Sequence, residues 1–567
     1  MKKILWGLLV VSLVLLLAVY FKLQPERPPQ SQVFMNARVL TMDPNLPVAE
    51  AVAVQDARIV AVGSRDDMTP YINADTVIHD LNGKTLMPGF IDAHGHFPAS
   101  GLSVFGLDLN SPPIGNISSM TELLARLTEK AAQTPEGEWV FGYGYDDTLL
   151  QDKRHPTRLE LDEVSSAHPI AIWHISGHML VANSKALALA GIDENTPNPE
   201  GGVIVKDPAS GELTGLLEEE ARIPVLEMSM DLSVFQFLEM IKKASVDYLA
   251  KGVTVAQSGA LDGTMMQGLW LAQKLNLSPL RLELWPYYDS LGKELIEGQK
   301  KAEDFESDQL NLGAIKITAD GSIQGFTGYL SKPYHTPYHG KDDYRGYPTI
   351  PRDELTRIVT RFHKAGYQLA IHGNGDASID DIIHAFSEAQ KTHFREDPRL
   401  ILVHAQMARE DQLLRMKELG ITPTFFSAHT YYWGDRHRDI FMGPERAANM
   451  SPAKSAVDLG LRFTTHLDTP VVPMDPLMGA WTTVNRKTSS GKVIGPHQRI
   501  SVEQALRAIT IDAAWQIFRE DEIGSVTPGK LADLVVLERD PLSHPKTFND
   551  IPVMRTVIGG VTVYSRD

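Results

Sequence analysis

The sequence predicts an α/β protein built around a (β/α)8 TIM-type barrel, and three observations lead to this fold class. Short apolar runs alternate with helical patterns through the middle of the chain, from about residue 87 to residue 514. Eight of these runs have the length and composition of strands, which is the strand number of such a barrel. Several of the runs end in histidine, lysine or aspartate, and barrel active sites lie at the carboxyl ends of the strands.

The first 23 residues predict a membrane anchor. Lys2 and Lys3 precede the apolar run Ile4–Phe21, whose helix would be about 27 Å long, close to the thickness of a hydrocarbon core. Basic residues stay on the cytoplasmic side, so the remaining chain is expected on the non-cytoplasmic, periplasmic side. A cleaved signal peptide and a secreted protein are the alternative, although no clear cleavage site follows the run. Residues 24–32 are rich in proline and predict a stiff linker.

Both ends of the remaining chain are rich in predicted strands. Residues 33–86 and 515–567 are expected to form one composite β-sandwich domain, because the two ends of a domain often lie close together. The predicted strands are Val33–Leu40, Ala51–Val54, Arg58–Gly63, Ala532–Leu537, Val553–Ile558 and Val561–Tyr564.

Residues 87–514 predict the barrel itself. Helical patterns separate its strands, for example at Val234–Ala250, Arg352–Ala365, Arg409–Leu419 and Pro452–Leu459. The first two strands lie far apart in the sequence, so a large insertion is expected at about residues 100–250. The eight predicted strands are Phe90–Ala93, Val253–Gln257, Leu282–Pro286, Ala314–Thr318, Gln368–His372, Leu400–His404, Thr422–Phe426 and Arg462–His466.

Polar side chains stand at the ends of five of these strands. His94 and His96 follow the first strand at positions i and i+2, so both imidazoles project to the same face. Imidazole and carboxylate groups gathered at one end of a barrel favour a divalent metal, with Zn²⁺ preferred. The other members of this set are Lys316, His372, His404 and Asp468.

Composition narrows the functional class. The chain has no cysteine, which excludes disulfides, thiolate nucleophiles and thiolate metal sites. A formal net charge of −17 argues against a nucleic-acid partner. The expected partners are a small-molecule substrate and, through the N-terminal segment, a membrane; the sequence leaves the choice between monomer and homodimer open.

Five stretches of the chain resemble the amidohydrolase superfamily, in particular its amidohydrolase-3 or YtcJ-like branch of metal-dependent hydrolases. The resemblance extends from about Val33 to the C-terminus. The chain departs from the family pattern at His466-Leu467, where Gly-Ser or Ser is more usual, and at Asn374, where a larger apolar residue is common. The matching stretches are Met87–His96, Ile315–Ser322, Ile371–Asp376, His466–Val471 and Gly524–Leu537.

The resemblance implies a role for each polar residue at the strand ends. His94 and His96 would bind the more buried metal, and His372 and His404 would bind a second one. Lys316 would be carboxylated on its Nζ atom and bridge two ions. Asp468 would contact a metal, act as general base towards a metal-bound hydroxide, and then carry the proton to the leaving group. One or two divalent ions, Zn²⁺ above all, are therefore expected.

Lys316 needs separate consideration because a lysine ammonium has no lone pair and repels a cation. It suits a metal site only when modified or deprotonated. The alternative interpretations are a lysine that extends to solvent and an ion-pair partner of Asp320.

Five further residues are candidates for contact with substrate. His174 and His178 lie in the insertion, and Tyr431 and Trp433 follow the seventh strand, where they could form an apolar wall. Arg446 has the guanidinium needed to pair with a substrate carboxylate. Each also has an alternative interpretation, as a loop histidine, a core aromatic residue or a solvated arginine.

These observations predict a metal-dependent hydrolase that cleaves a C–N bond of an amide, formamide, urea or cyclic amide. An ester or lactone hydrolase would use the same residues. A non-catalytic, membrane-tethered binding protein is the third interpretation, and a missing ligand would have favoured it.

Overall fold

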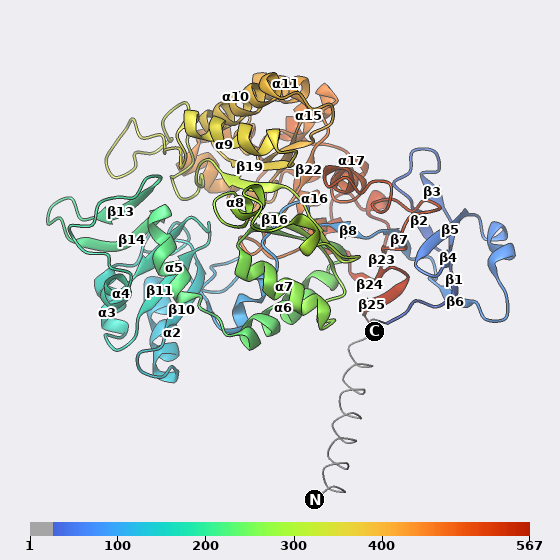
Figure 1. The fold of residues 1–567 in the computed structure, drawn as a ribbon, viewed down its shortest axis with the longest axis horizontal. Coiled ribbons are helices and arrows are strands. Elements are labelled where there is room, and N and C mark those ends of the chain that lie inside the picture. Colours follow the sequence, from blue (N-terminus) through green and yellow to red (C-terminus); the bar gives the residue numbers. More distant parts are fainter. Residues whose placement is uncertain (1–25, 567) are drawn as a thin grey trace, which may run out of the picture.

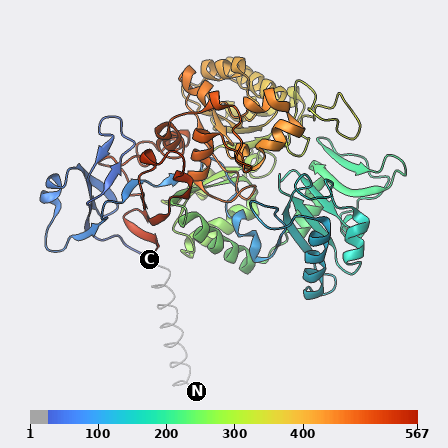
Figure 2. The ribbon, with the colours of Figure 1, turned by 180° about the vertical axis from the view of Figure 1, so that it is seen from behind.

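The computed structural model describes residues 26–566, and it confirms the α/β class. A central region of parallel strands and helices lies between a β-rich region formed by both chain ends and a separate insertion (Figures 1 and 2). Within residues 26–566 no helix is long and apolar enough to cross a membrane. The predicted anchor, Ile4–Phe21, lies outside these residues and stays a prediction.

The central strands form two parallel sheets, with the orders β17-β16-β15-β8 and β18-β19-β20-β21-β22. A parallel bridge between Tyr287 and Lys316 joins the sheets on one side. On the other side His96 donates its backbone N–H to Thr469 O at 2.9 Å, so the strands close into a ring. The strands are β8 (Phe90–Ile91), β15 (Val253–Leu261), β16 (Arg281–Pro286), β17 (Leu310–Leu312), β18 (Ile315–Thr318), β19 (Leu369–Gly373), β20 (Leu400–His404), β21 (Ile421–Phe425) and β22 (Thr464–Thr465).

Amphipathic helices cover these strands. In α9 (Arg352–Lys364) the buried residues Leu355, Ile358, Val359 and Phe362 recur at helical spacing, so one face packs on the sheet. The other helices of this region are α6 (Val234–Leu249), α7 (Gly263–Lys274), α8 (Leu291–Ile296), α10 (Asp376–Thr392), α11 (Glu410–Leu419), α12 (His429–Tyr432), α13 (Gly434–Arg436), α14 (Gly443–Ala448), α15 (Ala453–Leu459), α16 (Pro476–Asn485), α17 (Val502–Arg507) and α18 (Ile511–Gln516). Short 3₁₀ or π turns are η1 (Asp66–Tyr71), η2 (Ala99–Val104), η3 (Glu220–Arg222), η4 (Ala302–Asp304), η5 (His437–Phe441), η6 (Pro496–Gln498), η7 (Pro541–Ser543) and η8 (Phe548–Asp550).

The two chain ends share a mixed sheet of order β25-β24-β23-β7-β2-β3, which packs on a second sheet of order β5-β4-β1-β6. Phe34 and Val52 of one sheet share an apolar core with Leu86 and Val536 of the other. The single strand predicted at Val33–Leu40 is wrong: Asn36 has a φ of 54° and turns the chain from β1 into β2. The strands are β1 (Ser31–Met35), β2 (Arg38–Leu40), β3 (Val48–Ala49), β4 (Ala51–Gln55), β5 (Arg58–Gly63), β6 (Val77–Asp80), β7 (Thr85–Pro88), β23 (Leu534–Leu537), β24 (Val553–Ile558) and β25 (Val561–Ser565).

The insertion between β8 and β15 has its own six-stranded sheet, of order β13-β14-β12-β11-β10-β9. It lies on the opposite side of the central region from the chain ends (Figures 1 and 2). Its elements are β9 (Leu107–Asp108), α2 (Met120–Gln133), β10 (Val140–Tyr145), α3 (Arg158–Val164), β11 (Ile170–His174), β12 (Met179–Ala182), α4 (Ser184–Leu189), β13 (Gly202–Lys206), β14 (Leu213–Glu219) and α5 (Ile223–Ser229).

Candidate metal centre

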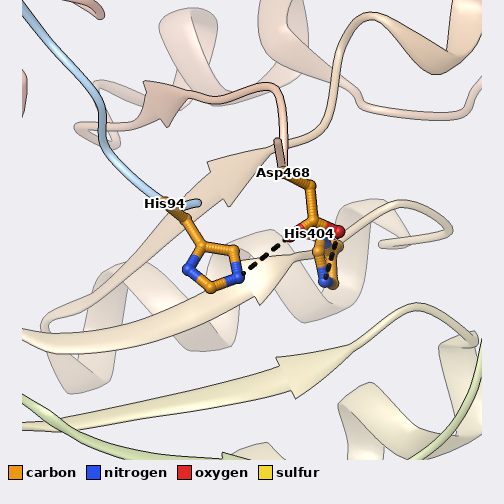
Figure 3. A group of neighbouring side chains, drawn as sticks. All are labelled: His94, His404 and Asp468. Carbon is orange, nitrogen blue, oxygen red and sulfur yellow. Dashed lines mark ion pairs between the residues drawn. The ribbon is translucent and has the colours of Figure 1, made fainter. Parts of the chain in front are cut away.

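The residues predicted at the strand ends meet in one cluster, part of which Figure 3 shows. Nε2 of His94 lies 3.3 Å from Oδ1 of Asp468, and Nε2 of His96 lies 3.2 Å from the same oxygen. Nε2 of His404 lies 4.0 Å from Oδ2, the other oxygen of this carboxylate. Asp468 therefore stands between histidines that come from different strands.

Two histidine nitrogens, from His372 and His404, also lie close together in this cluster. Nδ1 of His372 and Nε2 of His404 are 3.0 Å apart, and both rings are buried. The arrangement has two halves, one formed by His94, His96 and Asp468 and the other by His372 and His404.

Hydrogen bonds on the opposite nitrogens fix the orientation of the first two rings. His94 donates from Nδ1 to Oε1 of Gln257 at 3.0 Å, and Gly95 N donates to the same oxygen at 2.8 Å. Nδ1 of His96 lies 3.2 Å from Gly259 O. Because each Nδ1 carries the proton, each Nε2 offers a lone pair towards Asp468.

His466, one of the departures from the family pattern, orients His404. Nδ1 of His404 and Nε2 of His466 are 2.9 Å apart, and Nδ1 of His466 lies 3.1 Å from Oγ1 of Thr424. This chain of contacts leaves Nε2 of His404 free to face the cluster. Asn374, the other departure, contacts Nε2 of His372 through its Nδ2 atom at 3.1 Å.

Lys316 lies inside the cluster. Its Nζ is 3.0 Å from Nε2 of His94, and burial lowers its pKa to about 7. The alternative ion pair with Asp320 is not among the ion pairs of residues 26–566. The Asp320 carboxylate instead accepts backbone N–H groups of Tyr329, Asn374 and Gly375 at 2.8–3.0 Å.

The charges of these groups suit a cation. Burial lowers the pKa of His94, His372 and His404 well below the usual value, so their imidazoles are neutral. Burial raises the pKa of Asp468, but the neighbouring His404 and His94 outweigh it and hold this pKa well below its usual range. Within residues 26–566, Oδ1 of Asp468 is a buried acceptor without a hydrogen-bond donor. Neutral imidazoles around an ionised carboxylate are the donor set of a divalent metal, and the residues present therefore fit one.

Two members of the cluster have strained backbones. His404 and Asp468 have φ values of 69° and 53°, in the left-handed region. Such a conformation costs about 1–3 kcal/mol for a non-glycine residue and persists where function or packing demands it. The strain turns both side chains towards the cluster from the ends of β20 and β22.

His178 is the predicted substrate residue that the structure brings to the cluster. Its ring centroid lies 5.0 Å from that of His372, and its Nδ1 lies 2.7 Å from Oε2 of Glu219. Glu219 could not be predicted as its partner, because 41 residues separate it from His178. The sequence contains no signal that pairs them.

The other four predicted substrate residues lie apart from the cluster in the described chain. His174 contacts Asp147 with Nε2 at 3.1 Å within the insertion, whereas Trp433 donates from Nε1 to Asp146 at 3.0 Å and so joins the barrel to the insertion. Asp146 and Asp147 form with His174 a second acidic group, but Arg436 pairs with Asp146 at 2.7 Å.

Tyr431 and Arg446 have structural contacts. The Tyr431 ring packs edge-on against Trp481, with centroids 6.1 Å apart. Arg446 donates to the carbonyl oxygens of Met442, Lys332 and Pro333 at 2.9, 3.4 and 2.8 Å. Their contact with substrate, like that of His174 and Trp433, stays a prediction.

The fold and this donor set define a metal-dependent hydrolase, and the chain belongs to the amidohydrolase family, whose profile matches residues 77–564. The chain is 31% identical over 547 residues to the N-substituted formamide deformylase of Arthrobacter pascens, covering 94% of this chain and 98% of that protein. It is 28% identical over 533 residues to YtcJ of Bacillus subtilis, covering 91% and 96%.

A solved structure agrees with this membership. An uncharacterized metal-dependent hydrolase from Pyrococcus horikoshii superposes with a TM-score of 0.70 and 25% identity, covering 90% of this chain and 98% of that one.

Proposed function

We propose that the chain hydrolyses a C–N bond of a small amide, formamide, urea or cyclic amide. The observation that carries the proposal is the Asp468 carboxylate between the Nε2 atoms of His94, His96 and His404, at 3.2–4.0 Å. The relative from Arthrobacter pascens is named for action on N-substituted formamides, which supports the formamide member of this class.

The residues divide into two sets of proposed metal ligands. His94, His96 and Asp468 would hold one cation, and His372 and His404 a second. Lys316 would bridge them as a carbamate, because its Nζ points at Nε2 of His94 and its pKa near 7 leaves much of the amine neutral and able to react with CO₂. Without thiolates, the nitrogen and oxygen donors favour Zn²⁺. When bound, such an ion polarises a carbonyl group and lowers the pKa of water towards about 7.

Asp468 is the proposed proton carrier. Its low pKa keeps the carboxylate ionised at neutral pH, so it can accept the proton of the attacking water. Amine is a poor leaving group, and the same carboxyl returns this proton to the leaving nitrogen as the C–N bond breaks. The products are an amine and a carboxylic acid (a carbamic acid from a urea), which stay joined in one molecule when the amide is cyclic, and water is the only co-reactant.

We also propose that the N-terminal segment anchors the hydrolase on the non-cytoplasmic side of a membrane. This proposal rests on the apolar run Ile4–Phe21 and its flanking lysines. Fractionation with alkaline carbonate washing tests it: an anchored chain stays with the membranes, and a cleaved, secreted chain does not.

Metal analysis by plasma mass spectrometry followed by an amidase assay tests the catalytic proposal. We expect about two divalent ions per chain and release of amine from N-butylformamide. About one ion would contradict the Lys316 bridge alone. A chain that takes up no metal after reconstitution and releases no amine would overturn the proposal.

A further inference from the structure

We propose that His178, held in place by Glu219, accepts a hydrogen bond from the N–H of the scissile amide, so that the enzyme selects secondary amides. This inference rests on the proposed function and adds a specificity-determining contact to it. The insertion would thus supply a residue to a site that is otherwise built by the barrel.

The position of His178 is fixed from three sides. Its backbone N–H donates to Oγ of Ser176 at 3.1 Å, and its ring packs on His372 with the centroids 5.0 Å apart. Its Nδ1 contacts Oε2 of Glu219 at 2.7 Å. The side chain keeps 14% of its surface exposed, so the ring lies beside a proposed metal ligand and still reaches solvent.

The chemistry of Glu219 determines which nitrogen is available. A carboxylate oxygen accepts hydrogen bonds, so Nδ1 of His178 donates in this contact. A ring that carries its one proton on Nδ1 has an acceptor at Nε2. Within residues 26–566 this Nε2 atom has no hydrogen-bond partner, whereas Nδ1 is occupied. A free acceptor beside the cluster recognises a donor, and the scissile N–H of a secondary amide is one. Tertiary amides and esters have no such group.

Glu219 is buried and has an unusual backbone conformation. It is 3% exposed, and its φ of 49° with ψ of −123° lies outside the regions that non-glycine residues favour. A Cβ at Gly321 would come within 2.0 Å of its Oε1 atom, so the glycine leaves room for the carboxylate. Among residues 26–566, Oε1 has no hydrogen-bond partner, and His178 is the side chain that Oε2 contacts. The strained, buried carboxylate therefore serves chiefly to hold His178.

The neighbouring Glu218 provides a matched control. It is also 3% exposed and lies on the same strand, β14, but its carboxylate accepts the hydroxyls of Tyr338 and Tyr347 at 3.0 and 3.1 Å. It has no contact with His178 within the described chain. Glu218→Gln therefore reports the effect of changing a buried carboxylate on this strand without disturbing His178.

The experiment uses the metal-loaded full chain and three probes of similar size: N-butylformamide, N-butyl-N-methylformamide and butyl formate. The variants are His178→Ala, His178→Gln, Glu219→Ala and Glu218→Gln. For each probe, kcat/KM of the variant is divided by that of the wild type, which removes differences in intrinsic reactivity. Metal content and melting temperature are measured for every variant.

We expect His178→Ala and Glu219→Ala to lower kcat/KM for the secondary formamide about 10- to 100-fold, the effect of one lost hydrogen bond to a buried group. The ester and the tertiary formamide should change less than about threefold on the same reasoning. His178→Gln keeps an acceptor at similar reach and should recover part of the loss. Glu218→Gln should match the wild type, and metal content should be unchanged throughout.

Equal losses on all three probes, or a loss of metal in His178→Ala, would overturn the inference and leave the proposed function standing. A kcat/KM for the secondary formamide that His178→Ala leaves unchanged would do the same. A metal-loaded wild type that hydrolyses none of the probes would instead overturn the formamide form of the proposed function, and the inference with it.

Discussion

Asp468 combines a low pKa with a strained backbone, and its substitution separates proton transfer from metal binding. Asparagine has the same shape and tolerates a φ of 53° well, so Asp468→Asn should fold normally. Because the amide cannot accept the proton of water, turnover should fall about 10²- to 10⁴-fold. Amide hydrolysis and metal content are measured on the same preparation. Hydrolysis near the wild-type rate would show that another group is the base.

His466 should affect the metal through His404. His466→Phe removes the nitrogen that contacts Nδ1 of His404 and should weaken metal binding about 10- to 100-fold, the usual effect of losing a partner that orients a ligand. Competition with a chromophoric chelator measures the affinity.

Thr424→Val is the matched variant, because Thr424 is the next residue in the series of contacts from His404 through His466. It removes only the contact to His466 Nδ1. It should have a smaller effect than His466→Phe. An unchanged affinity in His466→Phe would show that packing alone orients His404.

At the scale of single residues, the sequence predicts the members of the cluster better than the residues that support them. The cluster of His94, His96, Lys316, His372, His404 and Asp468 could be predicted because each of them stands in or directly after an apolar run. Gln257 and Glu219 could not, because a buried amide or carboxylate in a strand has no pattern that names its partner. The partner of Trp433 could not be predicted either: its buried indole N–H needs an acceptor and finds one in Asp146, far away in the sequence.

At the scale of elements, Glu218 joins β14 of the insertion to the segment that follows β18, and this contact makes stability depend on pH. Burial raises the pKa of Glu218 to about 7, above the usual value of 4.5. Between these values the folded chain holds a proton that the unfolded chain has lost, so the folded state loses stability as pH rises from about 4.5 to 7. The loss is about 3 kcal/mol when complete.

Glu218→Gln removes the ionisation and keeps the shape. Its melting temperature relative to the wild type should therefore rise between pH 5 and pH 8, and differential scanning calorimetry of the metal-free chain measures this difference. A difference that does not vary with pH would mean that Glu218 is ionised in the folded chain throughout.

The elements that the sequence revealed are those with long, uninterrupted patterns. The helices at Arg352 and Arg409 appear within a residue or two of their predicted bounds, because their apolar spacing is regular. β17 was missed because it has three residues, two of them half-buried. Pro88 ends β7 and pairs with Leu534, although proline usually marks a turn. The insertion was expected, but its sheet was not, since the pairing of its strands depends on contacts distant in sequence.

At the scale of the whole molecule, the metal should stabilise the barrel, because its proposed ligands come from the ends of five strands. An ion present at 100 times its dissociation constant adds about 2.7 kcal/mol to the free energy of unfolding. Removal by a chelator should lower the melting temperature, and Zn²⁺ should restore it. A chain in which His94, His372 and Asp468 are replaced together should show no shift on either treatment. An equal shift in that variant would place the stabilising ion elsewhere.

The pairing of β7 with β23 determines when, during synthesis, the sheet shared by the two chain ends can be completed. Met87 lies opposite Val535, so synthesis must pass through the entire barrel before this sheet can be completed. At 5–20 residues per second, that interval is about 20–90 s. During it β7 has an open edge, and such edges invite pairing with other chains. The newly made chain thus covers the edge of β7 only when its last strands have been synthesised. Nascent chains that stop before β23 should be the ones that aggregate or require a chaperone.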